Sequence, residues 1–306
     1  LRYASPFPRG RAESNVSHIR AGESDLHGEA SSREYTCAVL DNPRSPRVRG
    51  VAKLAKRDGR ASSGQFLLEG PQSVAEALAF RPELVVELFA TPTAFDRYGE
   101  IAQRAADADI DVEFVTEHVL DAMADTVTPQ GIIAVCRQFP TSLKEILSSG
   151  PKLIAILEEV RDPGNAGTII RAADAAGADA VILTGRSVDL YNPKVVRSST
   201  GSIFHLPVAV GVELEAVLLK VQQSGLTVLA ADIKGDDLLA ARVEGLLAKP
   251  TAWLFGNEAR GLSDEHFALA DRAITVPIYG HAESMNLATA ASVCLYESAF
   301  AQWSAR

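Results

Sequence analysis

The sequence has few of the residues that build disulfide frameworks and metal sites. Its three cysteines, Cys37, Cys136 and Cys294, lie far apart and form no C-x-x-C pair. The six histidines are dispersed, and the H-E-x-x-H pattern of zinc enzymes does not occur. This distribution argues against a disulfide scaffold and against a metal enzyme, and it is typical of a protein from a reducing compartment. We therefore expect a cytoplasmic protein that uses no metal.

Long apolar runs are also missing. No stretch approaches the roughly 20 apolar residues that span a bilayer, and the first residues carry no apolar segment like that of a secretory signal peptide. Hydrophobic residues make up 47% of the chain and charged residues 23%, which is the balance of a soluble globular protein. We expect no membrane partner.

Positive charge is scarce overall but is concentrated in one segment. The formal net charge is -9, which by itself argues against a nucleic-acid partner. Residues 44–60, however, read RSPRVRGVAKLAKRDGR, with seven Lys or Arg and a single acid, Asp58. Clustered charge matters more to a phosphate backbone than the global sum does. From these residues alone, the segment is either a solvated first helix or an RNA contact.

The pattern of apolar residues predicts two α/β domains. Residues 1–40 are rich in Ser, Gly and Arg, and we expect a disordered tail there. Residues 44–138 alternate between strand-like and helix-like stretches in a small α/β domain, and residues 139–151 form a linker. Residues 152–306 alternate more strongly, and apolar strands such as KLIAILEEV predict a parallel sheet that is covered on both faces.

Two loops of the second domain follow predicted strands and carry polar side chains. The stretch RDPGNAGTIIRAAD places Asn165 before a helix and Arg171 on it, while WLFGNEARGLSDE places Gly256 and Glu258 directly after a strand. The carboxyl ends of strands are where open α/β sheets bind ligands. Taken separately, the two loops are more readily explained as ordinary turns, with a helix-surface arginine and a solvated glutamate.

A third stretch, residues 283–286, places Glu-Ser-Met-Asn at the mouth of the last helix. Ser284 alone could be a helix N-cap, and we expect the helix to run from Ser284 to about residue 301. Small and apolar residues surround most of that helix, so it should be buried. Its polar mouth is therefore expected to face a pocket or an interface.

Together the three stretches resemble the motifs of the SpoU (TrmH) branch of the SPOUT superfamily. The first motif has Asn, then Gly, then Arg six residues after the Asn, as at Asn165 and Arg171. The second ends a strand with Gly-x-Glu, as at residues 256–258. The third reads Ile-Pro-Met, a loop, then Ser-Leu-Asn; here Val-Pro-Ile stands at 276–278 and Ser-Met-Asn at 284–286.

The resemblance covers residues 152 to about 302, and the first half is similar, less specifically, to the family's substrate-binding domain. It implies an α/β fold whose C-terminal domain is a SPOUT trefoil knot, with a smaller N-terminal α/β substrate-binding domain. It also implies an RNA ribose 2'-O-methyltransferase that uses S-adenosyl-L-methionine and forms a homodimer through the knot domain. Ribosomal RNA is the first expected substrate and tRNA the second; an antibiotic-resistance methyltransferase is a close relative that stays open.

The resemblance assigns roles to individual residues. The implied catalytic set is Arg171, Asn165, Glu258, Ser284 and Asn286. The implied cofactor-binding set is Gly256, Val276, Ile278, Met285 and Leu254. The implied RNA-binding set is Arg44, Arg47, Arg49, Lys53, Lys56 and Arg57. Since a guanidinium is effectively always protonated, Arg171 is better suited to clamping a phosphate than to acting as the base, which leaves Glu258 or a water as candidates.

Two other functions are weighed against this one. A dinucleotide-dependent oxidoreductase fits the alternating pattern, but the G-x-G-x-x-G fingerprint is missing. A non-catalytic RNA-binding or ribosome-assembly protein could keep the fold, although intact Asn165, Arg171, Glu258 and Asn286 argue against lost catalysis.

Overall fold

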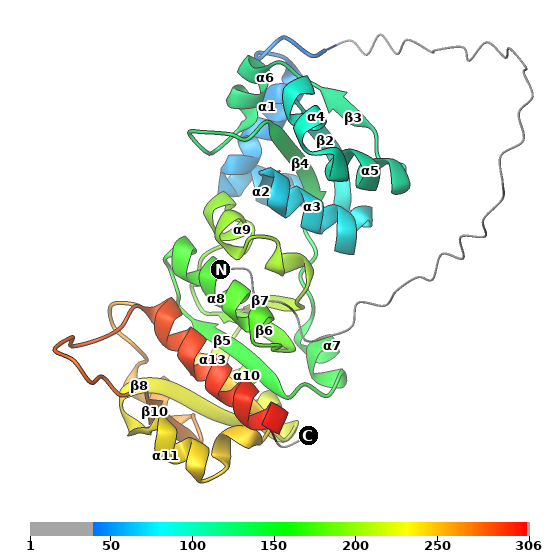
Figure 1. Ribbon diagram of the computed structural model, residues 1–306. Helices are drawn as coiled ribbons and strands as arrows, with labels where there is room; N and C mark the ends of the chain where they lie inside the picture. Colours follow the sequence, from blue (N-terminus) through cyan, green and yellow to red (C-terminus); the bar gives the residue numbers. More distant parts are fainter. Residues whose placement is uncertain (1–38, 305–306) are drawn as a thin grey trace, which may run out of the picture. The chain divides into compact units, whose positions relative to one another are not determined.

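The computed structural model describes residues 39–304, in which two separate β-sheets organise the chain (Figure 1). Nearly all of the tail expected at residues 1–40 lies outside the described residues. Its last residue, Leu40, forms a β-bridge with Val115 and donates its backbone N–H to the carbonyl of Phe114 at 2.8 Å. Within residues 39–304, no helix is long and apolar enough to cross a bilayer.

The first sheet has four strands in the order β1-β4-β2-β3. Its strands are β1 (Gln65–Glu69), β2 (Val85–Ala90), β3 (Val112–Phe114) and β4 (Ile132–Arg137). Strand β4 runs antiparallel to both β1 and β2, while β2 and β3 are parallel. The alternation along β1 turns Phe66 and Leu68 to one face and Leu67 to the other, so both faces are apolar and both are covered by helices.

Helices cover both faces of this sheet. They are α1 (Pro46–Ala52), η1 (Lys53–Ala55), α2 (Arg57–Ser63), α3 (Pro71–Phe80), η2 (Pro82–Leu84), α4 (Pro92–Arg97), α5 (Gly99–Asp107) and α6 (Glu117–Met123). Helix α4 begins at a capped end, because the side chain of Thr91 accepts from the backbone N–H of Ala94 at 3.3 Å and Pro92 follows in the first turn.

The second sheet has six parallel strands in the order β10-β8-β9-β5-β6-β7. Its strands are β5 (Leu153–Glu158), β6 (Ala180–Thr184), β7 (Val208–Val212), β8 (Thr227–Asp237), β9 (Thr251–Phe255) and β10 (Arg272–Thr275). All six residues of β5 are buried, which confirms the expected parallel strand covered on both faces. The chain builds outward from β5 to β7 on one side and places β9, β8 and β10 on the other.

Helices cover both faces of this sheet as well. They are α7 (Leu143–Ser148), α8 (Pro163–Ala175), α9 (Pro193–Ser199), η3 (Ser202–Phe204), α10 (Leu214–Gln223), α11 (Leu238–Val243), η4 (Leu246–Ala248), α12 (Asp264–Ala268) and α13 (Leu287–Ser304). Helix α13, drawn in red, packs against α8 and contacts β5 and β9 (Figure 1). Buried Trp253 of β9 donates its indole N–H to Ser298 of α13 at 2.9 Å.

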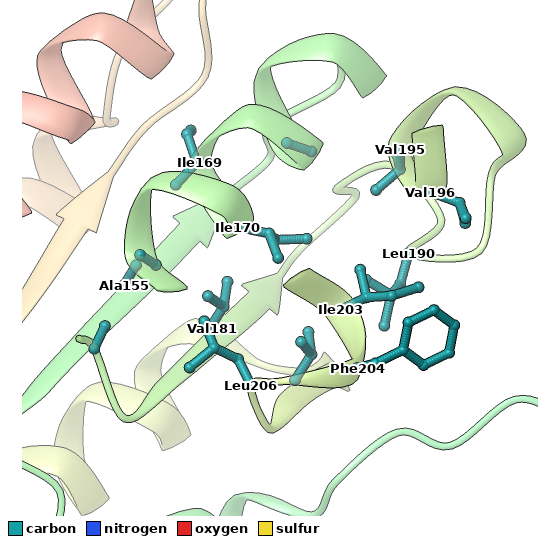
Figure 2. Packing of buried hydrophobic residues seen from close by; sticks show 14 of the residues in the cluster. Ala155, Ile169, Ile170, Val181, Leu190, Val195, Val196, Ile203, Phe204 and Leu206 are labelled. Carbon is teal, nitrogen blue, oxygen red and sulfur yellow. The ribbon is translucent and has the colours of Figure 1, made fainter. Parts of the chain in front are cut away.

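Helices α8 and α9 pack closely through the apolar cluster of Figure 2, which includes Ile170 and Val195. The close approach requires a glycine on α8. A Cβ added at Gly167 would lie 2.0 Å from the Oγ of Ser198 and 2.5 Å from the carbonyl oxygen of Val195. The glycine that stands two residues after Asn165 in the first motif is therefore explained by helix packing.

One apolar cluster is continuous between the two sheets. It includes Phe66 of β1 and Phe204 of η3, whose ring centroids are 6.4 Å apart. Two ion pairs flank this contact: Arg60 with Asp189 at 2.6 Å, and Arg197 with Glu69 at 2.8 Å. The α/β class and the parallel second sheet are as expected, and the threading of the chain through a knot stays a prediction.

Candidate active site

The loops after β5 and β9 are tied together by the carboxylate of Glu258. Its Oε1 accepts the backbone N–H of Asp162 at 3.0 Å, and its Oε2 accepts the backbone N–H of Arg161 at 3.2 Å. Strands β5 and β9 are neighbours, so the loops at their carboxyl ends meet at one edge of the sheet. The chain continues from β5 to β6 on one side, while β9 lies on the other side of β5, so the order of the strands reverses between β5 and β9. Open α/β sheets form a ligand crevice at such a point.

Two side-chain amides extend from Glu258 to the start of α13. Asn165 donates from Nδ2 to Oε1 of Glu258 at 3.3 Å, and Asn286 donates from Nδ2 to Oδ1 of Asn165 at 3.0 Å. We call these three side chains the amide–carboxylate relay. The structure thus brings three of the five expected catalytic residues, from three distant segments, into one continuous set of hydrogen bonds.

Both asparagines are fixed by the helices on which they lie. Asp162 caps α8 by accepting the backbone N–H of Asn165 at 2.8 Å, and Pro163 fills the first helical position. Asn286 caps α13, because its Oδ1 accepts the backbone N–H groups of Ala288 at 2.9 Å and Thr289 at 3.2 Å. The last helix therefore begins at Leu287 with Asn286 as its cap; the expected start at Ser284 is three residues too early.

A pocket of about 460 Å³ opens beside the relay. Five of the expected site residues line it: Glu258, Val276, Ile278, Ser284 and Met285. Its wall also contains Phe255, Asp232 and Lys234, which the sequence reasoning did not single out. Apolar and polar groups therefore converge on one concave site, as in most small-molecule pockets.

Two residues of the expected cofactor set lie outside the lining of this pocket. Leu254 is fully buried in the cluster on the opposite face of the sheet with Ile156, and its neighbour Phe255 provides the apolar wall. Alternation along β9 separates these two side chains. A Cβ at Gly256 would lie 2.5 Å from the carbonyl carbon of Gly261, so glycine is needed here because the loop folds back on itself.

Arg171 lies apart from the relay of its own chain. Its side chain is exposed and donates from Nη1 to Oγ1 of Thr200 at 3.3 Å. Six helical residues separate it from Asn165, and at about 100° per residue this offset turns the two side chains roughly 120° apart on α8. Within one chain, the structure therefore does not bring Arg171 to the Asn165–Glu258 contact.

Asn257 organises the loop after β9, although it occupies only the variable position of the Gly-x-Glu motif. Its Nδ2 donates to the carbonyl of Glu159 at 2.8 Å, while its Oδ1 accepts the backbone N–H groups of Ala259 at 3.1 Å and Arg260 at 3.2 Å. Glu159 itself has a positive φ of 51°. An Asn in a turn after a strand is a sign of such a local cap.

The basic segment contains exposed side chains and one buried, ion-paired arginine. The six expected RNA-contact residues, Arg44, Arg47, Arg49, Lys53, Lys56 and Arg57, are all exposed. Arg47 also pairs with Glu87 at 2.7 Å and Glu113 at 3.0 Å, so its charge is partly compensated. The seventh cation, Arg60, is buried and bonds Asp189 and the carbonyls of Leu54 and Ala55.

The thiols in the described part of the chain offer no nucleophile. Cys136 and Cys294 are both fully buried, and burial raises the pKa of each thiol well above its usual range. Among residues 39–304, no group of three or more His, Cys, Asp or Glu is placed to hold a metal ion.

Both halves of the chain match known protein families. Residues 152–296 match the SpoU rRNA Methylase family, and residues 67–142 match the RNA 2'-O ribose methyltransferase substrate binding family. The 23S rRNA (guanosine(2553)-2'-O)-methyltransferase RlmP of Bacillus subtilis is 32% identical over 259 residues, covering 84% of this chain and 97% of that protein.

Solved structures of similar proteins contain the methyl donor. The crystal structure of an AdoMet-bound rRNA methyltransferase from Sinorhizobium meliloti has 30% sequence identity and a TM-score of 0.73, covering 85% of this chain and 97% of that one. The SpoU methyltransferase AviRb from Streptomyces viridochromogenes, in complex with AdoMet, has 28% identity and a TM-score of 0.73, covering 85% and 100% of the two chains. The chain belongs to the SpoU rRNA methylase family.

Proposed function

We propose that the protein transfers a methyl group from S-adenosyl-methionine to a ribose 2'-hydroxyl of ribosomal RNA. The observation that carries this proposal is the amide–carboxylate relay beside the pocket at the carboxyl edge of the parallel sheet. The names of the relatives from Bacillus subtilis and Sinorhizobium meliloti support rRNA as the substrate, ahead of tRNA.

The pocket fits the cofactor in size and chemistry. Its volume of about 460 Å³ lies within the roughly 300–1,000 Å³ of small-molecule sites. Val276, Ile278 and Met285 offer apolar walls for the adenine, while Asp232 and Lys234 offer charges of both signs for the amino-acid end. When bound, S-adenosyl-methionine supplies an electrophilic methyl group on sulfur.

Within the site, Glu258 is suited to holding the loops in place. Its two oxygens already accept hydrogen bonds from Arg161, Asp162 and Asn165, so little acceptor capacity is left for a substrate proton. Arg171 stays protonated and would clamp the phosphate beside the reacting ribose through paired N–H donors. These two arguments favour water as the acceptor of the hydroxyl proton.

We also propose a homodimer in which each Arg171 serves the relay of the other protomer. The orientation of Arg171 toward Thr200, away from its own Asn165, supports this arrangement. Helix α13 leaves Phe300 and Trp303 about half exposed, and large exposed apolar side chains are characteristic of interaction surfaces.

The domain limits expected from the sequence become part of the proposal. Residues 44–138 would hold the RNA, residues 139–151 would link the domains with α7 inside the linker, and residues 152–306 would carry out the transfer. The scattered cysteines are in keeping with a cytoplasmic location.

The test is methylation of total RNA by the purified chain with radiolabelled S-adenosyl-methionine. RNA from cells that lack the gene should be the best acceptor, with label at one ribose of the large-subunit rRNA. Mapping by resistance to alkaline cleavage locates the mark. Label on tRNA, or on a base, would contradict the substrate or the chemistry.

A further inference from the structure

Thr200 occupies a backbone conformation that suits its residue type poorly. It follows the last residue of α9 with φ 52° and ψ 37°, in the left-handed region. Among residues 39–304, only Asp109, Glu159 and Thr200 combine a side chain with a positive φ, and Thr200 is the β-branched one. A branched side chain in this region is a real outlier, and glycine is the usual residue at such a helix end.

The local turn does not require the threonine side chain. The turn is closed by the backbone N–H of Thr200, which donates to the carbonyl of Arg197 at 3.1 Å, and glycine would make the same bond. What glycine could not provide is the hydroxyl. Its oxygen accepts from Nη1 of Arg171 at 3.3 Å and lies 3.5 Å from the carbonyl oxygen of Arg197, to which it donates.

Helix α9 is held firmly enough to maintain the strain. Arg197 pairs with Glu69 at 2.8 Å, and Ser198 donates to the carbonyl of Pro163 at 3.1 Å, so α9 is fastened both to β1 and to the start of α8. Strained residues persist where the surroundings determine their conformation, and they concentrate at functional positions.

We propose that Thr200 is a positioning residue for Arg171, whose guanidinium its hydroxyl holds ready for a substrate phosphate. Among residues 39–304, the guanidinium of Arg171 donates a side-chain hydrogen bond to the hydroxyl of Thr200, and this bond anchors it. A long arginine side chain loses much rotamer freedom when it is held, and a side chain held beforehand loses less on binding RNA. This inference rests on the proposed function, because it needs Arg171 to act on RNA.

Three variants of the full-length chain separate the hydroxyl from the strain. Thr200→Ser keeps the hydroxyl, Thr200→Val keeps the branched shape without it, and Thr200→Gly removes both the hydroxyl and the strain. We expect kcat for RNA methylation to fall about tenfold in Thr200→Val and Thr200→Gly, as for loss of one bond to a charged group. Thr200→Ser should stay within about twofold of the original chain.

The decisive readout is the opposite movement of stability and activity in Thr200→Gly. Its melting temperature should equal or exceed that of the original chain, because a left-handed residue is relieved, while its kcat falls. Affinity for S-adenosyl-homocysteine, measured by calorimetry, should be unchanged in all three variants. A purely structural role for Thr200 would instead make activity follow stability.

Arg171→Ala, assayed in parallel, distinguishes failure of the positioning role of Thr200 from failure of the role proposed for Arg171. If Arg171→Ala is inactive while Thr200→Val and Thr200→Gly keep full kcat, the positioning role is overturned and the proposed function stands. If Arg171→Ala keeps full kcat, the role proposed for Arg171 fails, and the inference about Thr200 fails with it. Failure of Thr200→Ser to retain activity would also overturn the inference.

Discussion

The side-chain amides of Asn165 and Asn286 are joined by a 3.0 Å hydrogen bond, although 121 positions of the chain separate the two residues. Each amide is used at both ends. Asn286 accepts from the first turn of α13 while donating to Asn165, and Asn165 accepts from Asn286 while donating to Glu258. An acid lacks the N–H donor and a serine lacks the reach, so the contact calls for an amide at both positions.

The two tasks of Asn286 can be separated by substitution. Asn286→Ala removes the cap and the bond to Asn165, and it should cost about 1 kcal/mol of unfolding free energy together with most activity. Asn286→Ser keeps a good helix cap but cannot bridge to Asn165. We expect its stability to be close to that of the original chain and its methylation rate to be at least about tenfold lower. Chemical denaturation and a methyl-transfer assay measure the two effects; a fully active serine variant would contradict the role of the bridge.

Sharing of Arg171 across a dimer predicts recovery of activity in mixed dimers. An Arg171→Ala protomer paired with an Asn286→Ser protomer contains one site with intact Asn286 and the partner's intact Arg171. Each variant alone should keep about a tenth of the original activity or less, and the purified mixed dimer should recover about half of it, because one of its two symmetric sites is complete. Two different affinity tags isolate the mixed species. Confirmed mixed dimers that show no recovery would place Arg171 and the relay in the same protomer.

Substitution by alanine should affect different properties at two arginines of the basic segment: RNA binding at Arg57 and stability at Arg60. Arg57 is exposed, so Arg57→Ala should leave stability unchanged, weaken RNA binding and reduce the slope of log K against log salt by about 0.7–0.9. Arg60 has a side chain only 3% exposed and pairs with Asp189, so Arg60→Ala should cost about 3 kcal/mol by leaving that carboxylate unpaired. Fluorescence anisotropy at several salt concentrations and urea unfolding provide the readouts. Equal stability of the two variants would contradict the burial of Arg60.

Substitution of a helical glycine by alanine should change stability in opposite directions at Gly167 and Gly50. Gly167→Ala forces a Cβ against Ser198 and the carbonyl of Val195, and it should destabilise the chain by about 1–3 kcal/mol. Gly50→Ala is the matched control, because no atom lies within 4 Å of its added Cβ on α1, and it should stabilise by about 0.5–1 kcal/mol. Melting temperatures compare the two. A neutral Gly167→Ala would show that α8 and α9 can move apart at little cost.

The sequence was informative where the local pattern and the tertiary structure agree. A threonine followed by a proline is a typical helix start, and at Thr91-Pro92 the hydroxyl of Thr91 does cap α4. It was less informative where the pattern was uniform. All five residues of β9 are buried and all but Thr251 are apolar, so nothing in TAWLF indicates that Phe255 faces the pocket and Leu254 the opposite core.

The sequence predicted which loops form the candidate site, but it did not predict the contacts and directions of their side chains. Ser284 and Asn286 are both good helix caps, and the choice of Asn286 is accompanied by its contact with Asn165, which is distant in the sequence. The direction of Arg171 depends on where α9 ends, which no local pattern encodes. Arg60 looked like its basic neighbours because its partner, Asp189, lies 129 positions away.

The apolar cluster that joins Phe66 of β1 to Phe204 of η3 limits how such a chain can be rebuilt. Exchanging the whole first half for another recognition module would strip Phe204 and Tyr191 of their ring contacts with Phe66 and leave Asp189 without Arg60. Exposed residues such as Arg57 can be substituted without disturbing these contacts between the two halves. Substitution of exposed residues is therefore a more practical route to a new substrate preference than replacement of the whole first half of the chain.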